Sequence, residues 1–242
     1  LVTTMIISSI IAKRAASDIR DNAQAQLGNR IQLPPSTDNK IGVVYGSAYM
    51  KPIVVDAKIS TDNKTMWYVL VFSEAMENDS IGTFSYGDIY WGDKKLNFDE
   101  TDQTKVVSWT DSNGQTDTKA ADKIHMYLYR DGSEAPLNTT LKAWEVLQDE
   151  NIDAANQWDT TKKMSKLVFA ICKLNYDQDA GITGLAEISA VINNTLSKPG
   201  SVIKDYLMNQ RYGAGLDIAR VNTTSLDAVS YTHLRAHETR ED

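Results

Sequence analysis

The sequence predicts an α+β fold in which a β-rich domain precedes a smaller α/β module. From residue 41 to about residue 135, apolar and polar residues alternate in short runs that end at Asp, Asn, Gly or Ser, which is the pattern of half-buried strands. After residue 140 helix-forming residues appear, followed by two more alternating runs and one helical run. The chain has 242 residues, which is enough to bury a sizeable core.

The predicted organisation has four parts, and the changes in composition set their boundaries. They are an apolar N-terminal segment with a helix and linker (1–40), the β-rich domain (41–140), the α/β module (141–229) and a non-native, disordered tail (230–242). Within the first part, helix formers predict a helix over 13–28, and "LPPSTDNK" (33–40) reads as a linker because of its prolines.

The two ends of the chain are unusual. The first twelve residues, "LVTTMIISSIIA", are largely apolar but too few to cross a bilayer, which takes about 20. We expect a buried or assembly-interface helix there; the alternative is the end of a membrane segment, because the chain begins at Leu1 and reads as a fragment. The tail from Ser230 resembles translated read-through of a sequencing adapter, as in metagenomic assemblies. His233 and His237, four residues apart in that tail, are therefore not interpreted as a metal pair.

The body of the chain shows strand runs with clear limits. They cover 41–50, 52–60, 66–75, 88–98, 106–109 and 123–132 in the β-rich domain, and 163–177 and 184–195 in the module. In "YWGDKKL" (90–96), the Gly92-Asp93 pair predicts a tight hairpin. Residues 141–159 contain helix formers with a broken periodicity.

The stretch "PGSVIKDYLMNQRYGAGL" (199–216) predicts one short, docked helix. Pro199 suits the first turn, and Ser197 before it is a candidate N-cap. Arg211 is expected in the last turn and Gly213 at the left-handed C′ position. The residues expected to form its buried face are Val202, Ile203, Tyr206 and Leu207.

Charge and cysteine content exclude several classes of protein. The formal net charge of −7 does not favour nucleic acid or an anionic membrane surface, so we expect no nucleic-acid partner. The one cysteine, Cys172, excludes an internal disulfide. Because its run is strand-like and no histidine is paired with it, we expect a buried, inert thiol. The five tryptophans are expected to pack in a core or an interface.

One short segment resembles the start of a calcium loop. In "NYDQDAG" (175–181), Asn175, Asp177 and Asp179 alternate as oxygen ligands would, but Ala180 and Ala186 stand where the EF-hand pattern needs Gly and Glu. We therefore expect a polar turn between two strands, with no metal and no cofactor.

No pattern of catalytic residues is evident. The sequence contains no phosphate-binding glycine loop, no H-E-x-x-H and no G-x-S-x-G. Asp205 is expected to be solvated or locally hydrogen-bonded, without a catalytic role. We expect no enzymatic activity.

Three segments resemble the host-specificity protein J family of lambda-like tailed phages and related tail-tip proteins. "IGVVYGSAYMKPIVVD" (41–56) is similar to the segment with a P-V-V-Y-G signature, although Gly42 replaces the proline. "QWDTTKKMSKLVFAICKLNYDQDAGITGLAEISAVINNT" is similar to the family's tryptophan, L-x-Y-D strand and G-L-x-E-I strand. "SKPGSVIKDYLMNQRYGAGL" is similar to N-P-A-x-V-I-x-D-Y-L-x-x-x-R-Y-G-x-G. The matches keep their order over 41–226.

This resemblance implies a structural role in a phage tail tip. Family members form a hub that is usually trimeric, sits at the distal end of the tail tube and contacts other tail proteins. A C-terminal extension, which this fragment lacks, reaches toward the host receptor. The implied location is the virion tail tip, after synthesis in the bacterial cytoplasm. The residues that match the family's motifs are Tyr45, Gly46, Pro199, Asp205, Tyr206, Arg211, Tyr212, Gly213 and Gly215.

Two alternatives from other classes remain open at this stage. The first is a membrane-anchored bacterial surface adhesin, with residues 1–12 as the end of the anchor. The second is a carbohydrate-active enzyme, for which paired carboxylates are needed and no pair can be nominated. A neighbouring tape-measure or tail gene supports the phage, whereas an upstream secretion signal supports the adhesin.

Deleting residues 230–242 should leave the melting temperature unchanged, because that segment has no periodic apolar face to pack. Thermal unfolding followed by circular dichroism measures the effect. A loss of several degrees would show that the tail is a native element.

Overall fold

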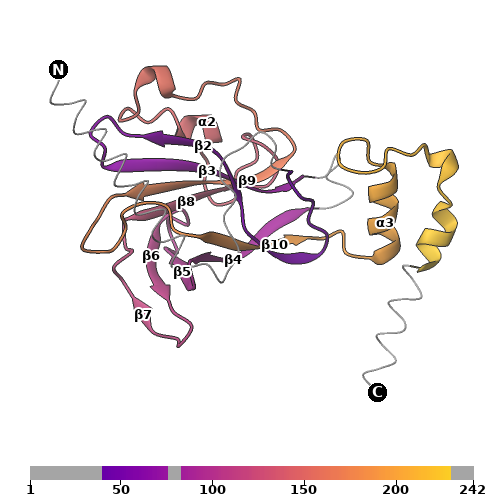
Figure 1. Ribbon diagram of the computed structural model, residues 1–242, viewed down its shortest axis with the longest axis horizontal. Helices are drawn as coiled ribbons and strands as arrows, with labels where there is room; N and C mark the ends of the chain where they lie inside the picture. Colours follow the sequence, from indigo (N-terminus) through magenta and orange to yellow (C-terminus); the bar gives the residue numbers. More distant parts are fainter. Residues whose placement is uncertain (1–39, 76–82, 230–242) are drawn as a thin grey trace.

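The computed structural model describes residues 40–75 and 83–229. In these two ranges the strands form two antiparallel sheets that share a core (Figure 1). One sheet has six strands in the order β1-β10-β4-β5-β6-β7, and the other has four in the order β2-β3-β9-β8. The predicted α+β, β-rich fold class is confirmed.

The elements have the following bounds. The six-stranded sheet contains β1 (Ser47–Met50), β10 (Ile188–Asn194), β4 (Phe84–Trp91), β5 (Lys94–Phe98), β6 (Val106–Thr110) and β7 (Thr116–Asp117). The four-stranded sheet contains β2 (Ile53–Ile59), β3 (Thr65–Glu74), β9 (Leu167–Asn175) and β8 (Ile124–Tyr129). The short helices include α2 (Ala143–Val146), η1 (Ala154–Asn156), α3 (Pro199–Met208) and η2 (Ile218–Arg220). Residues 223–229, at the end of the described range, are also helical.

The four-stranded sheet is buried on both faces. On β3, Leu70 and Phe72 face a first core that lies between the two sheets. Their neighbours Val69 and Val71 face a second core on the opposite side of the sheet, because side chains alternate along a strand. The segment with α2 and η1 covers that second core, with the side chains of Ala143, Val146, Leu147, Ile152 and Trp158.

The predicted boundary at residue 140 does not divide the structure. Strand β9 pairs with β3 on one side and β8 on the other, and β10 lies between β1 and β4. Both sheets therefore contain strands from the expected β-rich domain and from the expected module. The composition changes near residue 140 because a loop-rich segment, which covers the second core, begins there. The change does not mark the start of a second folding unit.

Several local predictions are confirmed. Gly92 has φ 63° in the tight turn between β4 and β5. Cys172 is fully buried on β9, and burial raises the pKa of its thiol far above the usual range. Four of the tryptophans are at most 8% exposed and belong to the two cores: Trp67, Trp91, Trp109 and Trp158.

Other local predictions are wrong. These predictions concern helix α3, whereas residues 141–159, with helix formers in a broken periodicity, form the short helices α2 and η1. Helix α3 has Pro199 in its first turn, as expected, but its N-cap is Lys198, whose side chain makes no capping bond. The predicted buried face of α3 is only partly covered, since Ile203 is 45% and Tyr206 is 52% exposed, whereas Val202 and Leu207 are half-buried. Helical periodicity correctly predicted the helix, but not which face would be covered.

Predictions for the chain ends lie outside the described residues. They concern the apolar segment, helix and linker before Lys40 and the tail after residue 229, with His233 and His237. Among the helices of the described ranges, none has both the length and the apolar character that crossing a bilayer requires.

Leu70→Ala and Ile171→Ala should each destabilise the whole described fold by about 2–5 kcal/mol, because each removes a fully buried side chain from a packed core. Leu70 belongs to the predicted first domain and Ile171 to the predicted second module. We expect each variant to show one cooperative transition at a lower denaturant midpoint. If unfolding showed two transitions and each variant shifted only one of them, the result would contradict a structure in which both predicted domains share the same sheets.

Candidate functional site

The candidate site is the junction between the chain before β1 and the region of α3. Asp205, on α3, accepts a hydrogen bond from the Tyr45 hydroxyl at 2.7 Å through its Oδ2 atom. The Tyr212 hydroxyl donates to the same oxygen at 2.9 Å. Tyr45 and Tyr212 also pack at the margin of the first core. One carboxylate thus joins two segments that are 160 residues apart in sequence.

The surroundings of Tyr45 keep its hydroxyl protonated. Burial, followed by the hydrogen bond to Asp205, raises the pKa of the Tyr45 hydroxyl far above its usual range. Tyr45 therefore remains a protonated donor at any physiological pH. Asp205 was expected to be solvated or locally hydrogen-bonded. Its bond with Tyr212 is local, whereas its bond with Tyr45 is a long-range contact that was not expected.

A second polar contact joins the region of α3 to the end of β3 and to the residue before β9. The Arg211 guanidinium donates from Nη2 to the Lys166 carbonyl oxygen at 2.8 Å and forms an ion pair with Glu74 at the end of β3. Burial raises the pKa of the Glu74 carboxyl, and the Arg211 charge opposes that rise. Because α3 ends at Met208, Arg211 lies beyond the helix. Its role is this contact, and the predicted place in the last helical turn is wrong.

Three glycines in the motif have distinct roles. A Cβ on Gly213 would lie 2.0 Å from the Tyr206 carbonyl oxygen, so no side chain fits where the turn passes the helix. The left-handed residue is Gly215, with φ 63°, and not Gly213 as predicted. Gly46 has φ 65°, and its N–H donates to the Leu196 carbonyl oxygen at 2.9 Å. The glycines therefore serve backbone geometry.

Four of the nine motif residues make side-chain contacts at the junction. The Tyr45–Asp205 bond joins the two motif segments, Tyr212 binds Asp205 within its own segment, and Arg211 contacts Lys166 and Glu74. Pro199 serves the helix start, whereas Tyr206 is exposed and takes no part in the junction. Two further residues belong to the junction. Glu74 lies outside the matched segments, and Lys166 lies within the second one but was not singled out, because it contributes only its carbonyl oxygen.

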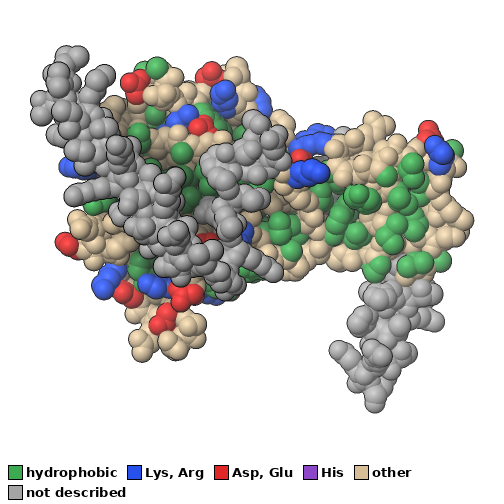
Figure 2. Space-filling view, in the orientation of Figure 1, with side chains coloured by type: hydrophobic (Ala, Val, Ile, Leu, Met, Phe, Trp, Pro, Cys, Tyr) green, Lys and Arg blue, Asp and Glu red, His purple; other side chains and the backbone are tan. Residues whose placement is uncertain are grey.

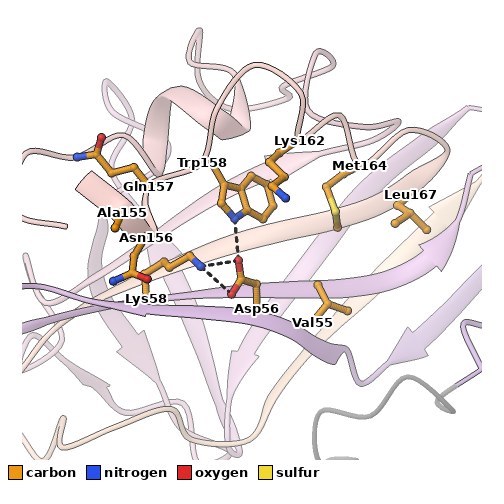
Figure 3. Close-up of a pocket in the computed structure, with 10 residues that line it drawn as sticks. All are labelled: Val55, Asp56, Lys58, Ala155, Asn156, Gln157, Trp158, Lys162, Met164 and Leu167. Atoms are coloured by element: carbon orange, nitrogen blue, oxygen red, sulfur yellow. Dashed lines mark hydrogen bonds and ion pairs between the residues drawn. The ribbon is translucent and has the colours of Figure 1, made fainter. Parts of the chain in front are cut away.

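A separate open groove lies beside the edge strand β2, with a volume of about 470 Å³ (Figure 3). Asp56 is at its centre, where it accepts a hydrogen bond from the Trp158 indole N–H at 2.7 Å and pairs with Lys58 at 3.0 Å. Met164 and Leu167 form an apolar end. Sequence reasoning missed this groove because its two sides come from β2 and from residues 155–167.

The groove does not supply the residue pair of a glycoside hydrolase. That chemistry requires two carboxyl groups on opposite sides of the scissile bond. Asp56 is the one carboxylate among the described residues that line the groove, and it is already bound to Lys58 and Trp158.

The calcium-like segment forms a turn between β9 and β10. Asp177 makes an ion pair with Lys123 at 2.7 Å and accepts a hydrogen bond from the Ala180 N–H. The Asn175 side chain accepts from Thr65 and donates to the Asp122 carbonyl oxygen. Asp179 is exposed. Two of the three candidate ligands are thus engaged with protein groups.

Cys172 and His125 do not form a catalytic pair. His125 on β8 faces Lys173 across the strand pair, whereas Cys172 lies in the first core with Met126. The two side chains are therefore on opposite faces of the sheet. Burial, and then the Lys173 charge, lowers the pKa of His125.

No protein-family model matches the chain, and no curated protein matches it at a significant level. The resemblance to phage tail-tip proteins therefore stays a prediction that depends on the motif residues alone.

Millimolar calcium should leave the melting temperature unchanged to within about one degree, because binding would have to displace Lys123 from Asp177. Differential scanning fluorimetry with calcium, with magnesium and with a chelator measures the effect. A rise that calcium alone produces, and that Asp177→Ala removes, would establish a calcium site.

Proposed function

We propose that the chain is a structural subunit of a phage tail tip, where it helps to build the hub at the end of the tail tube. The observation that carries the proposal is the contact between the two motif segments. Tyr45 belongs to the "VVYG" segment, and Asp205 and Tyr212 belong to the "DYLMNQRYGAG" segment, and these three side chains share hydrogen bonds. Segments matched independently to one family meet at one place in the fold.

The chemistry of the motif residues also supports a structural role. Tyr45 and Arg211 hold distant segments together, and Gly213 and Gly215 permit a close turn. None of these four residues belongs to a nucleophile–base pair or to a pair of facing carboxylates. These are the roles expected of residues that define a fold.

The proposed partners are copies of the same chain and other tail proteins. A tube end with rotational symmetry requires a head-to-tail interface that closes into a ring, and the family resemblance makes that ring a trimer. Contact with a host receptor is assigned to a C-terminal extension beyond this sequence. The proposed location is the tail tip of the virion, after synthesis in the host cytoplasm.

Labelling of virions tests the function directly. The antibodies are raised against the fragment covering residues 40–229 and are applied to phage particles whose genome encodes the chain. In electron micrographs they should mark only the distal end of the tails. Labelling of bacterial envelopes without labelling of tails would replace the phage proposal with the adhesin.

The fragment should form a weak, concentration-dependent trimer, or a monomer with an exposed apolar patch on the sheets. Apolar side chains on the strands are available for such contacts: Tyr49, Val55 and Ile59 are 43–50% exposed. Light scattering across a concentration series measures the mass. A stable dimer at every concentration would contradict the hub, because a two-fold interface does not close a three-fold ring.

A further inference from the structure

The last described part of the chain, residues 199–229, contributes little to either core. We call it the C-terminal arm. Of its residues, Gly200, Asn209 and Val221 are buried, and Val221 is the one apolar side chain larger than alanine among them. Ile203, Tyr206 and Ile218 are 45–60% exposed. Figure 2 shows hydrophobic side chains spread over the surface of this arm, which projects from one end of the sheets in Figure 1.

The first half of the arm is held together by its own hydrogen bonds. After α3, the Ala214 N–H donates to the Tyr206 carbonyl oxygen, and the Leu216 N–H donates to the Leu207 carbonyl oxygen, both at 2.8 Å. The Asn209 side chain accepts from the N–H groups of Arg211 and Tyr212. The helix and the turn after it therefore form one unit that does not need the sheets for its backbone bonds.

One apolar contact and several polar contacts hold this unit to the sheets. The apolar contact is the Tyr212 side chain, which packs at the margin of the first core. Tyr45 donates to Asp205 at 2.7 Å, and Arg211 bridges to Glu74 and to the Lys166 carbonyl oxygen. Helix α3 packs extensively against none of the described strands. The free-energy cost of local opening is lower for a region with few buried apolar contacts than for the core. These polar contacts therefore contribute much of the free energy that holds the arm against the sheets.

A short connection before the arm can act as its hinge. Leu196 is still fixed, because its carbonyl oxygen accepts from the Gly46 N–H and its own N–H donates to the Asn194 side chain. Ser197 and Lys198 follow and are both exposed. A change of backbone angles at these two residues moves α3 without disturbing β10.

We propose that the C-terminal arm is a latched element, which swings away as a unit while both sheets stay folded. The latch consists of Tyr45, Asp205, Tyr212, Glu74 and Arg211, and the hinge lies at Ser197 and Lys198. Opening separates Asp205 from Tyr45 and Arg211 from Glu74, and it leaves the hydrogen bonds within the arm intact. The inference depends on the contacts of the fold and is independent of the phage assignment.

Hydrogen exchange followed by mass spectrometry tests the latch. The variant is Tyr45→Phe with Arg211→Gln, which removes one hydroxyl and one charge from the latch. The matched control is Tyr206→Phe with Arg220→Gln, which makes the same changes at exposed positions of the arm. All measurements use the full chain.

In the unmodified chain, amides of α3 should exchange faster than those of β3 and β9. The latch variant should accelerate exchange in α3 at least about fivefold, since the Tyr45 hydrogen bond and both contacts of the Arg211 guanidinium are lost. It should change exchange in β3 and β9 less than about twofold. The control should resemble the unmodified chain.

Any of four results overturns the proposal. The first is equal protection of the amides of α3 and of the core strands in the unmodified chain, and the second is an acceleration of α3 exchange below about fivefold in the latch variant. The third is an acceleration of exchange in β3 and β9 equal to that in α3, and the fourth is a latch variant that no longer folds. The last two results would show that the arm is part of the global fold.

Discussion

The structure depends on one strand pair, β3 with β9, whose two faces both lie in a core. Val69 opposite Ile171 supports the second core, and Leu70 opposite Ala170 supports the first. Because side chains alternate along a strand, a shift of this pairing by one residue would exchange the two sets of side chains. The six-stranded sheet and the segment with α2 and η1 pack on opposite sides of this pair, so both layers take their positions from it.

Local signals in the sequence predicted the parts of the fold that depend on local chemistry. Alternation predicted β3 and β9, Gly92 predicted a hairpin, and Pro199 predicted the start of α3. The domain boundary was wrong because a change in composition does not show which strands will pair. The two sheets are formed by strands up to 146 residues apart, such as Ser47 and Asn193, and one sequence contains no direct signal for such pairings.

The junction shows the same division between local and distant information. Motif matching selected Tyr45, Asp205, Arg211 and Tyr212, yet it did not indicate that they touch. Glu74 could not be selected, since it is the last residue of an ordinary strand and its role in the junction arises from its ion pair with Arg211. The helical pattern likewise predicted the apolar face of α3 but not the solvent exposure of that face, because burial depends on which other segments pack against the helix.

The position of β10 also determines when the protein can fold during synthesis. This strand lies between β1 and β4, and β9 lies between β3 and β8. Both strands come late in the sequence, because residues 130–166 separate the end of β8 at Tyr129 from the start of β9. A nascent chain therefore presents unfilled gaps in both sheets until about residue 194 has left the ribosome. Open edges of this kind invite pairing with other chains. Folding of the two sheets therefore has to wait for β9 and β10, and the emerging chain is most vulnerable to aggregation just before these strands become available.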